Sequence, residues 1–511
     1  LHKAIRRQRQ MCIRDRNHIR WSGNNEISLQ EAQMRTFSNF AWMFLQTEGD
    51  YNFSSGSRGR GNLSSTANPY FLFPQIYNFR YNIYSSEWPV ANRAIELYLQ
   101  KKSENEGWER QINGLSNNEK ANLLLEKHTF KELLADVEQR NLQNNIVGLE
   151  ASRLFARSEI NMGVDAFRDS LYAMLKRNTF LNIKFENMLD TLGEMSRTDL
   201  YSYLKEWEQL TPLPFYSIGE PELTKVVNKG GEEFFVLKVL VSNNSDYDGI
   251  IQMNVLQNGW WYQPMEDPRA RKKVEIAAHT SKEFVSVWEE QIRDVEINTM
   301  VSGNLPYMIR QSIGNVKQER NKIVKDTIYT LPESSLEMPG EVIVDNEDST
   351  LFVLSTPAVV GLLPKWLDKV EDTSFKYSGI SWWRAPLQWT ATTNAKYYGK
   401  YIRSAYVIKS GDGSQTATWK IPVPEAGQYE LYYHVFKDDE LRWNDRLQGE
   451  YHFRVAYDSE MEDAYINLRK ANEGWEQLGT YYFSADTVRV VLTDECKLRS
   501  VTADAVKIVK R

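Results

Sequence analysis

Residues 415–436 read QTATWKIPVPEAGQYELYYHVF, and this stretch decides the fold of the C-terminal part of the chain. Apolar and polar side chains alternate in two short runs, which is the period of a strand with one buried face. Pro422, Pro424 and Gly427 interrupt the runs and are typical of a turn between two strands. The same alternation returns in EYHFRVAYD at 450–458. The pattern predicts a β-sandwich, and none of these runs contains the residues of a reaction centre.

Short motifs occur in a fixed order along the same part of the chain: VIVDNED at 342–348, ATW at 417–419, GQYELY at 427–432, Gly474-Trp475 with Leu478-Gly479 and Tyr482-Phe483, and VTADAV at 501–506. Together they resemble the golvesin C-terminal-like domain, which is also found in proteins described as xanthan lyases. The resemblance covers residues 338–511 and implies a β-sandwich of secreted or surface bacterial proteins that binds polysaccharide. A long insertion at about 349–380 departs from the family, and the family offers no ligand-binding residues to carry over.

The composition limits the class of protein. A chain of 511 residues is long enough for about two to four domains. The net charge of −6 gives no reason to expect nucleic acid as a partner. The chain has only two cysteines, Cys12 and Cys496, which excludes a framework of disulfides. The longest apolar stretch, 356–366, is shorter than the roughly 18–20 residues of a membrane span, so we expect no span in this sequence.

The first residues differ from the rest of the chain. Residues 1–20 contain seven Lys or Arg and one Asp, and the basic bias stops at Trp21. We expect residues 1–25 to be a disordered leader or a sequence artefact, and the alternative is a basic arm for acidic lipid or nucleic acid. Because the chain begins with Leu1, we also expect the true N-terminus to lie upstream.

Residues 26–212 are predicted to be mainly helical. A first helix at 26–48 begins with the capping-box pattern S-x-x-E at 28–31, and a loop rich in Gly, Ser and Asn follows at 54–69. A polar loop is expected at 103–119. Four further helices are expected at 141–160, 164–178, 185–196 and 198–210. Asp199 lies where a negative charge favours the N-terminal end of the last helix.

The pattern changes from helix to strand at Phe215. Alternating runs that predict strands occur at 232–244, 249–258, 273–290 and 293–300. Residues 213–318 therefore suit an immunoglobulin-like sandwich. We expect a polar linker at 319–337 and then the golvesin-like domain at 338–511. The predicted fold class is multidomain α + β, with an N-terminal helical region, an immunoglobulin-like β-sandwich and a C-terminal golvesin-like β-sandwich.

A second resemblance concerns residues 120–310. Trp207 lies near the end of the helical part, and Pro212, Pro214 and Tyr216 follow it before the strands begin. This order of elements resembles the C-terminal part of bacterial aminopeptidase-N-type zinc metallopeptidases. The resemblance implies a helical segment followed by an immunoglobulin-like domain, within a parent protein that is a peptidase and in some members is anchored in a membrane.

The chain lacks the motif that a zinc peptidase of this kind needs. H-E-x-x-H places two imidazoles one helical turn apart on the same metal. No two of the six histidines have that spacing; they are His2, His18, His128, His279, His434 and His452. We therefore expect no catalytic residue, no metal site and no cofactor in this chain, and any zinc site of the parent protein would lie upstream.

Other sites remain open to different interpretations. His434 and His452 could meet across strands, but we expect them to be packing or surface residues. Two carboxylates for glycoside cleavage are also open, because such partners meet only in three dimensions. Asp438-Asp439-Glu440 could bind calcium, but a solvated loop is the simpler interpretation. The carboxylates at 345–348 suggest a structural role at the first strand of the last domain, with or without an ion.

The candidates for ligand binding are tryptophans of the last domain: Trp382, Trp383, Trp389 and Trp475. If these rings are exposed, they form a platform on which a sugar ring stacks. If they are buried, they anchor the sandwich. The high content of Tyr and Phe does not decide between the two, because β proteins are in general rich in aromatic residues.

These observations favour a non-catalytic part of a bacterial envelope protein, located in the periplasm or at the cell surface. Its expected work is to bind glycan or another cell-surface polymer through the last domain, with a membrane involved only through sequence upstream. The alternative is the accessory half of a membrane-tethered zinc aminopeptidase. A third hypothesis is a polysaccharide lyase or hydrolase.

Overall fold

The computed structural model describes residues 82–99, 110, 113–136, 138–179, 181–210, 212–227, 230–256, 267–314, 316–320, 324–334, 336, 340–355, 375–380, 385–437, 449–458, 460–484 and 486–511. The predicted leader, the helix at 26–48 and the loop at 54–69 lie outside these residues. The chain divides into two compact units, one formed by Leu1–Ser103 with Phe130–Glu208, and one formed by Glu104–Thr129 with Gln209–Arg511.

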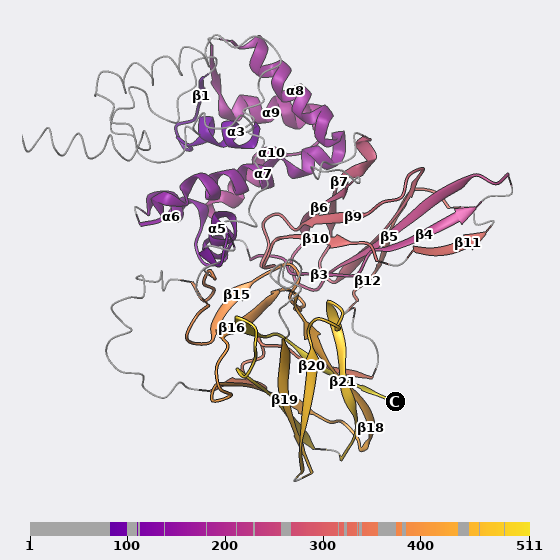
Figure 1. Cartoon of the computed structure of the whole chain (residues 1–511). Helices are drawn as coiled ribbons and strands as arrows, with labels where there is room; N and C mark the ends of the chain where they lie inside the picture. The colour runs from indigo at the N-terminus through magenta and orange to yellow at the C-terminus, as the bar shows by residue number, and fades with distance from the viewer. Residues whose placement is uncertain are drawn as a thin grey trace, which may run out of the picture. The chain divides into compact units, whose positions relative to one another are not determined.

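The described part of the first unit is mainly helical, with one short pair of strands (Figure 1). Its elements are β1 (Asn82–Tyr84), α3 (Ala91–Leu99), α6 (Phe130–Ala135), η1 (Glu138–Asn141), α7 (Gln143–Met162), α8 (Val164–Arg177), β2 (Asn182–Lys184), α9 (Phe185–Ser196), α10 (Leu200–Lys205) and η2 (Glu206–Glu208). Helices α7, α8 and α9 follow the predicted segments closely. Asp199 caps α10 by accepting the backbone N–H of Ser202 at 3.1 Å. No helix among the described residues is long and apolar enough to cross a membrane.

Aromatic side chains form the core of the helical unit. Trp207 is 2% exposed, and its ring packs against Trp88 at 5.2 Å and against Phe130 at 4.7 Å between centroids. Edge-to-face geometry of this kind adds to the free energy of burying the rings. Trp207 therefore fixes the end of the helical part, immediately before the chain enters the sandwich.

The second unit begins its sheet structure with an immunoglobulin-like sandwich. Its strands are β3 (Tyr216–Ile218), β4 (Glu222–Val227), β5 (Glu233–Asn243), β6 (Gly249–Leu256), β7 (Arg271–Ile276), β8 (Thr280–Trp288), β9 (Asp294–Asn298), β10 (Met308–Ser312), β11 (Val316–Arg320) and β12 (Thr327–Pro332). One sheet has the order β10-β9-β6-β7, and the other has the order β11-β4-β5-β8-β12, with β3 added beside β5. The two sheets enclose one apolar core that includes Leu237, Val239 and Ile251.

The expected linker at 319–337 differs from the observed structure. Strand β12 lies within it and pairs antiparallel with β8, while β11, which begins before it, pairs parallel with β4. The β-branched and aromatic residues of TIYTLP suit an edge strand, even though four of the six residues of the strand are exposed. The immunoglobulin-like sandwich therefore extends into residues that were expected, from their polar composition, to form a linker.

A helix that the sequence analysis missed joins the second unit. Helix α5 (Asn117–Leu125) begins with a complete capping box of Ser116 and Glu119, in a stretch where we expected a loop. Asn118 donates to the Tyr307 hydroxyl at 3.1 Å, and Asn122 donates to the carbonyl of Met300 at 3.2 Å. The expected helical region at 26–212 is corrected on this point, because α5 packs with the sandwiches.

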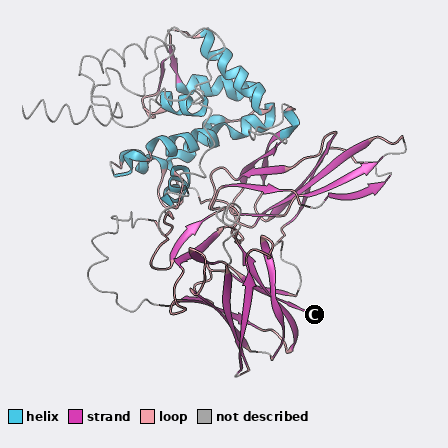
Figure 2. Ribbon diagram, viewed as in Figure 1, coloured by secondary structure: helices cyan, strands magenta, loops and turns pink. Residues whose placement is uncertain are grey.

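The C-terminal sandwich is built of strands (Figure 2), and its first strand pairs with its last. Its strands are β13 (Glu341–Val344), β14 (Phe352–Leu354), β15 (Thr390–Thr393), β16 (Ser404–Lys409), β17 (Thr416–Pro422), β18 (Gly427–Val435), β19 (Glu450–Tyr457), β20 (Glu460–Asn467), β21 (Gly474–Phe483), β22 (Thr487–Thr493), β23 (Ser500–Ala503) and β24 (Val506–Lys510). They form the sheets β13-β24-β18-β21, β14-β17-β22-β19-β20 and β15-β16-β23.

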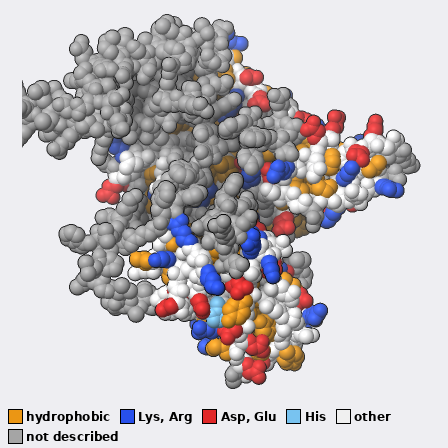
Figure 3. All heavy atoms as spheres, viewed as in Figure 1, with side chains coloured by type: hydrophobic (Ala, Val, Ile, Leu, Met, Phe, Trp, Pro, Cys, Tyr) orange, Lys and Arg blue, Asp and Glu red, His pale blue; other side chains and the backbone are white. Residues whose placement is uncertain are grey.

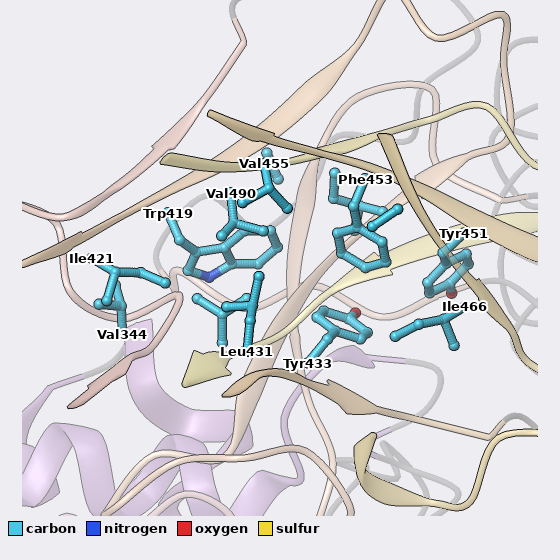
Figure 4. Close-up of a cluster of buried hydrophobic side chains, with 14 of the residues drawn as sticks. Val344, Trp419, Ile421, Leu431, Tyr433, Tyr451, Phe453, Val455, Ile466 and Val490 are labelled. Carbon is cyan, nitrogen blue, oxygen red and sulfur yellow. The ribbon is translucent and has the colours of Figure 1, made fainter. Parts of the chain in front are cut away.

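The alternation at 415–436 produces the core of this sandwich. Ala417, Trp419 and Ile421 face inward from β17, and Tyr429 and Leu431 face inward from β18. Figure 4 shows Trp419 between the side chains of both sheets. The predicted fold class, a multidomain α + β chain with β-sandwiches, is confirmed.

Trp419 offers a direct test of this core. Its ring is fully buried, and its Nε1 donates to the carbonyl of Asp504 at 3.2 Å. We expect Trp419→Ala to lower the free energy of unfolding of the sandwich by about 3–5 kcal/mol, and Trp419→Phe to cost less. Urea unfolding followed by circular dichroism measures both. A loss below about 1 kcal/mol for Trp419→Ala would show that the site is not a packed core.

His279 joins three loops at one end of the immunoglobulin-like sandwich. Its Nε2 lies 2.8 Å from Asp246 and its Nδ1 lies 2.7 Å from Glu333, just after β12. These hydrogen bonds, first that with Asp246 and then that with Glu333, raise the pKa of His279 above its ordinary value. The residue has a positive φ of 54°, a backbone conformation that His and Asn tolerate better than most residues.

A pH dependence of stability follows from the raised pKa. The contribution of protonated His279 is fully present below the unfolded pKa of about 6.5 and is lost as the pH rises through the higher folded pKa. We expect His279→Asn, which tolerates the same φ, to lower the melting temperature at pH 6 and to have no effect well above the folded pKa. Differential scanning fluorimetry across this range tests the sign. An equal loss at both ends would contradict it.

Candidate functional site

The structure separates the four predicted tryptophans. Trp382 and Trp383 lie outside the described residues. Trp389 is half-buried and packs against the core of the C-terminal sandwich, which favours the anchoring role for this residue. Trp475 lies on β21 and, unlike Trp389, takes no part in that core. Trp475 is therefore the candidate around which a binding surface can be built.

Trp475 stands on the outer face of the sheet β13-β24-β18-β21. It pairs directly with His434 of β18, whose neighbours Tyr433 and Val435 point into the core. Successive side chains of a strand point to opposite faces, so His434 and its cross-strand partner Trp475 point outward. The ring centroid of Trp475 lies 5.1 Å from that of His434 and 5.0 Å from that of Tyr398.

A lysine side chain also contacts the Trp475 ring. Lys507 Nζ lies 4.9 Å from the ring centre of Trp475 and 5.4 Å from that of Tyr432. The same ammonium forms an ion pair with Glu341 at 2.8 Å, and both side chains are largely buried. We name the residues Tyr398, Tyr432, His434, Trp475 and Lys507 the Trp475 surface. Its rings are fixed by cation–π and edge-to-face contacts before any ligand arrives.

A buried carboxylate orients His434. Asp504 Oδ2 lies 2.9 Å from Nδ1 of His434, and the two oxygens of Asp504 accept the backbone N–H of Tyr398 at 3.2 Å. Burial raises the pKa of Asp504, and the charge of His434 opposes that rise. We assign a proton to Nδ1, because Asp504 accepts there, so that Nε2 is the ring nitrogen left for a ligand.

The carboxylates at 345–348 have a structural role in this arrangement. Asp345 is half-buried, and its pKa is well above the ordinary value, first because the protein around it shields it from water and second because Asp504 is nearby. Glu347 accepts the hydroxyl of Tyr377 at 3.0 Å and also accepts the hydroxyl of Ser404. These bonds tie the end of β13 to the start of β16. Among the residues that the structure describes, no group of three or more His, Cys, Asp or Glu side chains is arranged to hold a metal.

The two histidines of the last domain do not meet. His434 lies on β18 and His452 lies on β19, and these strands belong to different sheets. The hypothesis that they share a site is therefore wrong. Asp438-Asp439-Glu440 lies outside the described residues. No sequence motif indicated that Tyr398 and Lys507 would flank Trp475, because each comes from a separate part of the chain.

Comparisons with known proteins support the assignment of the last domain. Residues 383–510 match the family model of the Golvesin C-terminal domain, which confirms the predicted resemblance for this segment. The match does not extend to 120–310, so the resemblance to aminopeptidases stays a prediction. No curated protein matches the sequence of the chain.

Solved structures show only distant likeness. A CBM35 from Cellvibrio japonicus Abf62 is 12% identical with a TM-score of 0.16, covering 22% of this chain and 75% of its own. A β-glucuronidase of Bacteroides uniformis is 11% identical with a TM-score of 0.17, and the match covers 61% of this chain and 31% of the glucuronidase. At these TM-scores neither likeness bears on function.

The raised pKa of Asp345 predicts a gain in stability when this acid is substituted. A carboxyl whose folded pKa is raised contributes stability below its unfolded pKa of about 3.9 and loses that contribution as the pH rises through the folded value. We expect Asp345→Asn, which can still accept the backbone N–H of Asn346, to raise the melting temperature at pH 7. A gain of about 1 kcal/mol corresponds to about 2–4 °C.

The control for this experiment is Asp504→Asn. The pKa of Asp504 is raised in the same direction, but its two oxygens accept from His434 and from the backbone of Tyr398. An amide has only one acceptor oxygen for these bonds, so the substitution is expected to lower the melting temperature at the same pH. Scanning calorimetry at pH 4 and pH 7 compares the two variants. A lower melting temperature for Asp345→Asn at pH 7 would show that Asp345 is charged and paired in the folded protein.

Proposed function

We propose that the C-terminal sandwich is a glycan-binding module of a secreted or surface bacterial protein, and that the Trp475 surface contacts the sugar. The observation that carries this proposal is the half-buried ring of Trp475, which is held on the outer face of the sheet by Tyr398, His434 and Lys507. The match of residues 383–510 to the Golvesin C-terminal domain supports it.

The chemistry of the Trp475 surface suits a neutral or weakly polar sugar. A rigid aromatic ring provides a large contact area at low conformational entropy cost, which suits the C–H face of a pyranose. The other ring nitrogen of His434, Nε2, is suited to a sugar hydroxyl, which can either donate or accept a hydrogen bond. Lys507 is already neutralised by Glu341, so this surface has no free cation with which to attract an acidic sugar.

The module acts by binding, and we propose no catalytic step for it. The carboxyl groups described around Trp475 are engaged within the protein, because Asp504 holds the His434 imidazole and Glu341 forms the ion pair with Lys507. Glycoside cleavage needs two carboxyl groups on either side of the bond. Incubation of the chain with polymers that it binds is therefore expected to leave their length unchanged, as measured by size-exclusion chromatography.

We also propose an alternative for the whole protein, the accessory half of a zinc aminopeptidase. The observation that favours it is the order of elements, with helices α7–α10 ending at Trp207 and a sandwich following from Tyr216. Its zinc ligands would lie in sequence upstream. Sequencing of the native locus tests this alternative, since a complete reading frame without H-E-x-x-H removes it.

Binding through Trp475 can be measured directly on the full chain. We expect affinity electrophoresis against a panel of bacterial and plant polysaccharides to find at least one that retards the protein. Trp475→Ala is expected to weaken this binding by roughly 10-fold or more, about 1.4 kcal/mol, and Trp475→Phe by less. Retention of full affinity by Trp475→Ala would refute the role of this ring.

The matched control is Tyr482→Ala. Tyr482 lies on the same strand, is 64% exposed, and is seven positions from Trp475, a distance of roughly 20 Å along a strand. We expect its loss to leave the affinity unchanged. Melting temperatures of all three variants show whether a change in binding comes from a change in folding.

A further inference from the structure

A second pair of rings stands on the outer face of the other sheet. His452 of β19 is the direct cross-strand partner of Tyr465 of β20, and their rings are 4.8 Å apart with an angle of 8° between the planes. This spacing equals the roughly 4.7–4.9 Å between neighbouring strands, so both rings stand upright on the sheet. One face of Tyr465 is covered by His452.

The other face of Tyr465 points toward the edge of the sheet. In the strand order of the described residues, β14-β17-β22-β19-β20, strand β20 is the last. Tyr465 is 58% exposed, in contrast to the buried tyrosines of the core. A large flat face is thus presented to solvent with its orientation fixed from behind. Figure 3 shows apolar, acidic and basic side chains close together on the surface of this sandwich.

Two exposed carboxylates flank the rings. Asp463 Oδ1 lies 2.7 Å from Nε2 of His452, and Glu495 Oε2 lies 3.2 Å from Nδ1. The carboxylate side chains are 59% and 61% exposed, so each keeps oxygen atoms open to a ligand. Two carboxylates outweigh one imidazole in either protonation state. The group of Tyr465, His452, Asp463 and Glu495, which we name the Tyr465 site, is therefore negative.

Neighbouring charges do not reverse this sign. On the same face of β19, Glu450 lies two positions before His452 and Arg454 lies two positions after it, opposite Asp463. Close to the rings, three carboxylates then stand against one guanidinium and one imidazole. Two further cations, Arg489 of β22 and Lys420 of β17, lie on the same face but opposite Ala456, four positions along β19 from His452. A ligand for the Tyr465 site itself is expected to carry positive charge, because charge complementarity sets specificity at an exposed surface.

We propose that the Tyr465 site binds a protonated amino sugar within a polysaccharide. An ammonium group near an aromatic face gains a cation–π attraction, and carboxylates add charge-assisted hydrogen bonds to the same group. A hexosamine offers both a flat C–H face and an amine in one residue, whereas a lysine side chain offers the amine without the flat face. The proposal concerns the opposite sheet from Trp475 and does not depend on glycan binding there.

The test uses the full chain and isothermal titration calorimetry with chitosan hexasaccharide, at a mildly acidic pH at which its amines are protonated. We expect binding that weakens with added salt, because exposed charges are screened. N-acetylated chitohexaose, which lacks the charges, is expected not to bind at the same concentration. Tyr465→Ala and the double variant Asp463→Asn, Glu495→Gln are each expected to reduce the affinity at least 10-fold.

Two control variants distinguish the Tyr465 site from the other aromatic surfaces of the chain. Tyr329→Ala removes another exposed tyrosine, 50% accessible, from β12 of the immunoglobulin-like sandwich and is expected to have no effect. Tyr482→Ala removes an exposed tyrosine from β21 of the opposite sheet and is expected to leave chitosan binding unchanged. Circular dichroism and melting temperatures confirm that each variant is folded, and Tyr465→Phe, which keeps the ring, is expected to retain binding.

Several results would overturn the proposal. They are the absence of chitosan binding, equal binding of the N-acetylated oligosaccharide, and full affinity in a folded Tyr465→Ala variant. Loss of binding in Trp475→Ala alone would assign the amine to the Trp475 surface instead. Tighter binding of oligolysine than of chitosan would identify a basic peptide as the ligand of this face.

Discussion

The C-terminal sandwich depends on the position of its last strand. Strand β24 lies inside its sheet, between β13 and β18, so the two ends of the domain pair with each other. The ion pair of Lys507 and Glu341 joins residues 166 positions apart across this pairing. Because side chains alternate along β24, Val506 and Ile508 fill the core while Lys507 points outward to Trp475. The same register therefore closes the fold and places a cation beside the aromatic surface.

Asp504, which lies just before β24, likewise serves both the fold and the aromatic surface. Asp504 is fully buried, and it holds the His434 ring and the backbone of Tyr398. Burial lowers the pKa of the nearby Arg403, while the field of Asp504 acts against that shift. Such groups are costly to desolvate and are retained where they fix one arrangement of the polar atoms around them. Here the arrangement fixed is that of the His434 and Tyr398 rings beside Trp475.

Much of the fold can be predicted from the sequence, but the site mostly cannot. Helix α9 and the strands around Trp419 follow from local periodicity, which needs no knowledge of distant residues. The sequence contains the capping-box pattern at Ser116, but the polar composition of the residues before it favours a loop. Strand β12 has exposed side chains, so periodicity gave no sign of it. The neighbours of Trp475 come from β18, β24 and the segment before β16, and no spacing within one segment predicts their meeting.

The acidic strand β20 raises the question of whether its charges serve binding or only protect an edge. Charged side chains on edge strands prevent pairing with another molecule, and Glu460, Glu462 and Asp463 are suited to that task. Protection of the edge does not explain Tyr465, because an exposed aromatic ring on an edge strand favours association. Nor does it explain why His452 is stacked on that ring and bonded to carboxylates at both nitrogens. A ring fixed upright by a histidine that itself carries two exposed carboxylates is suited to a ligand that is flat and cationic.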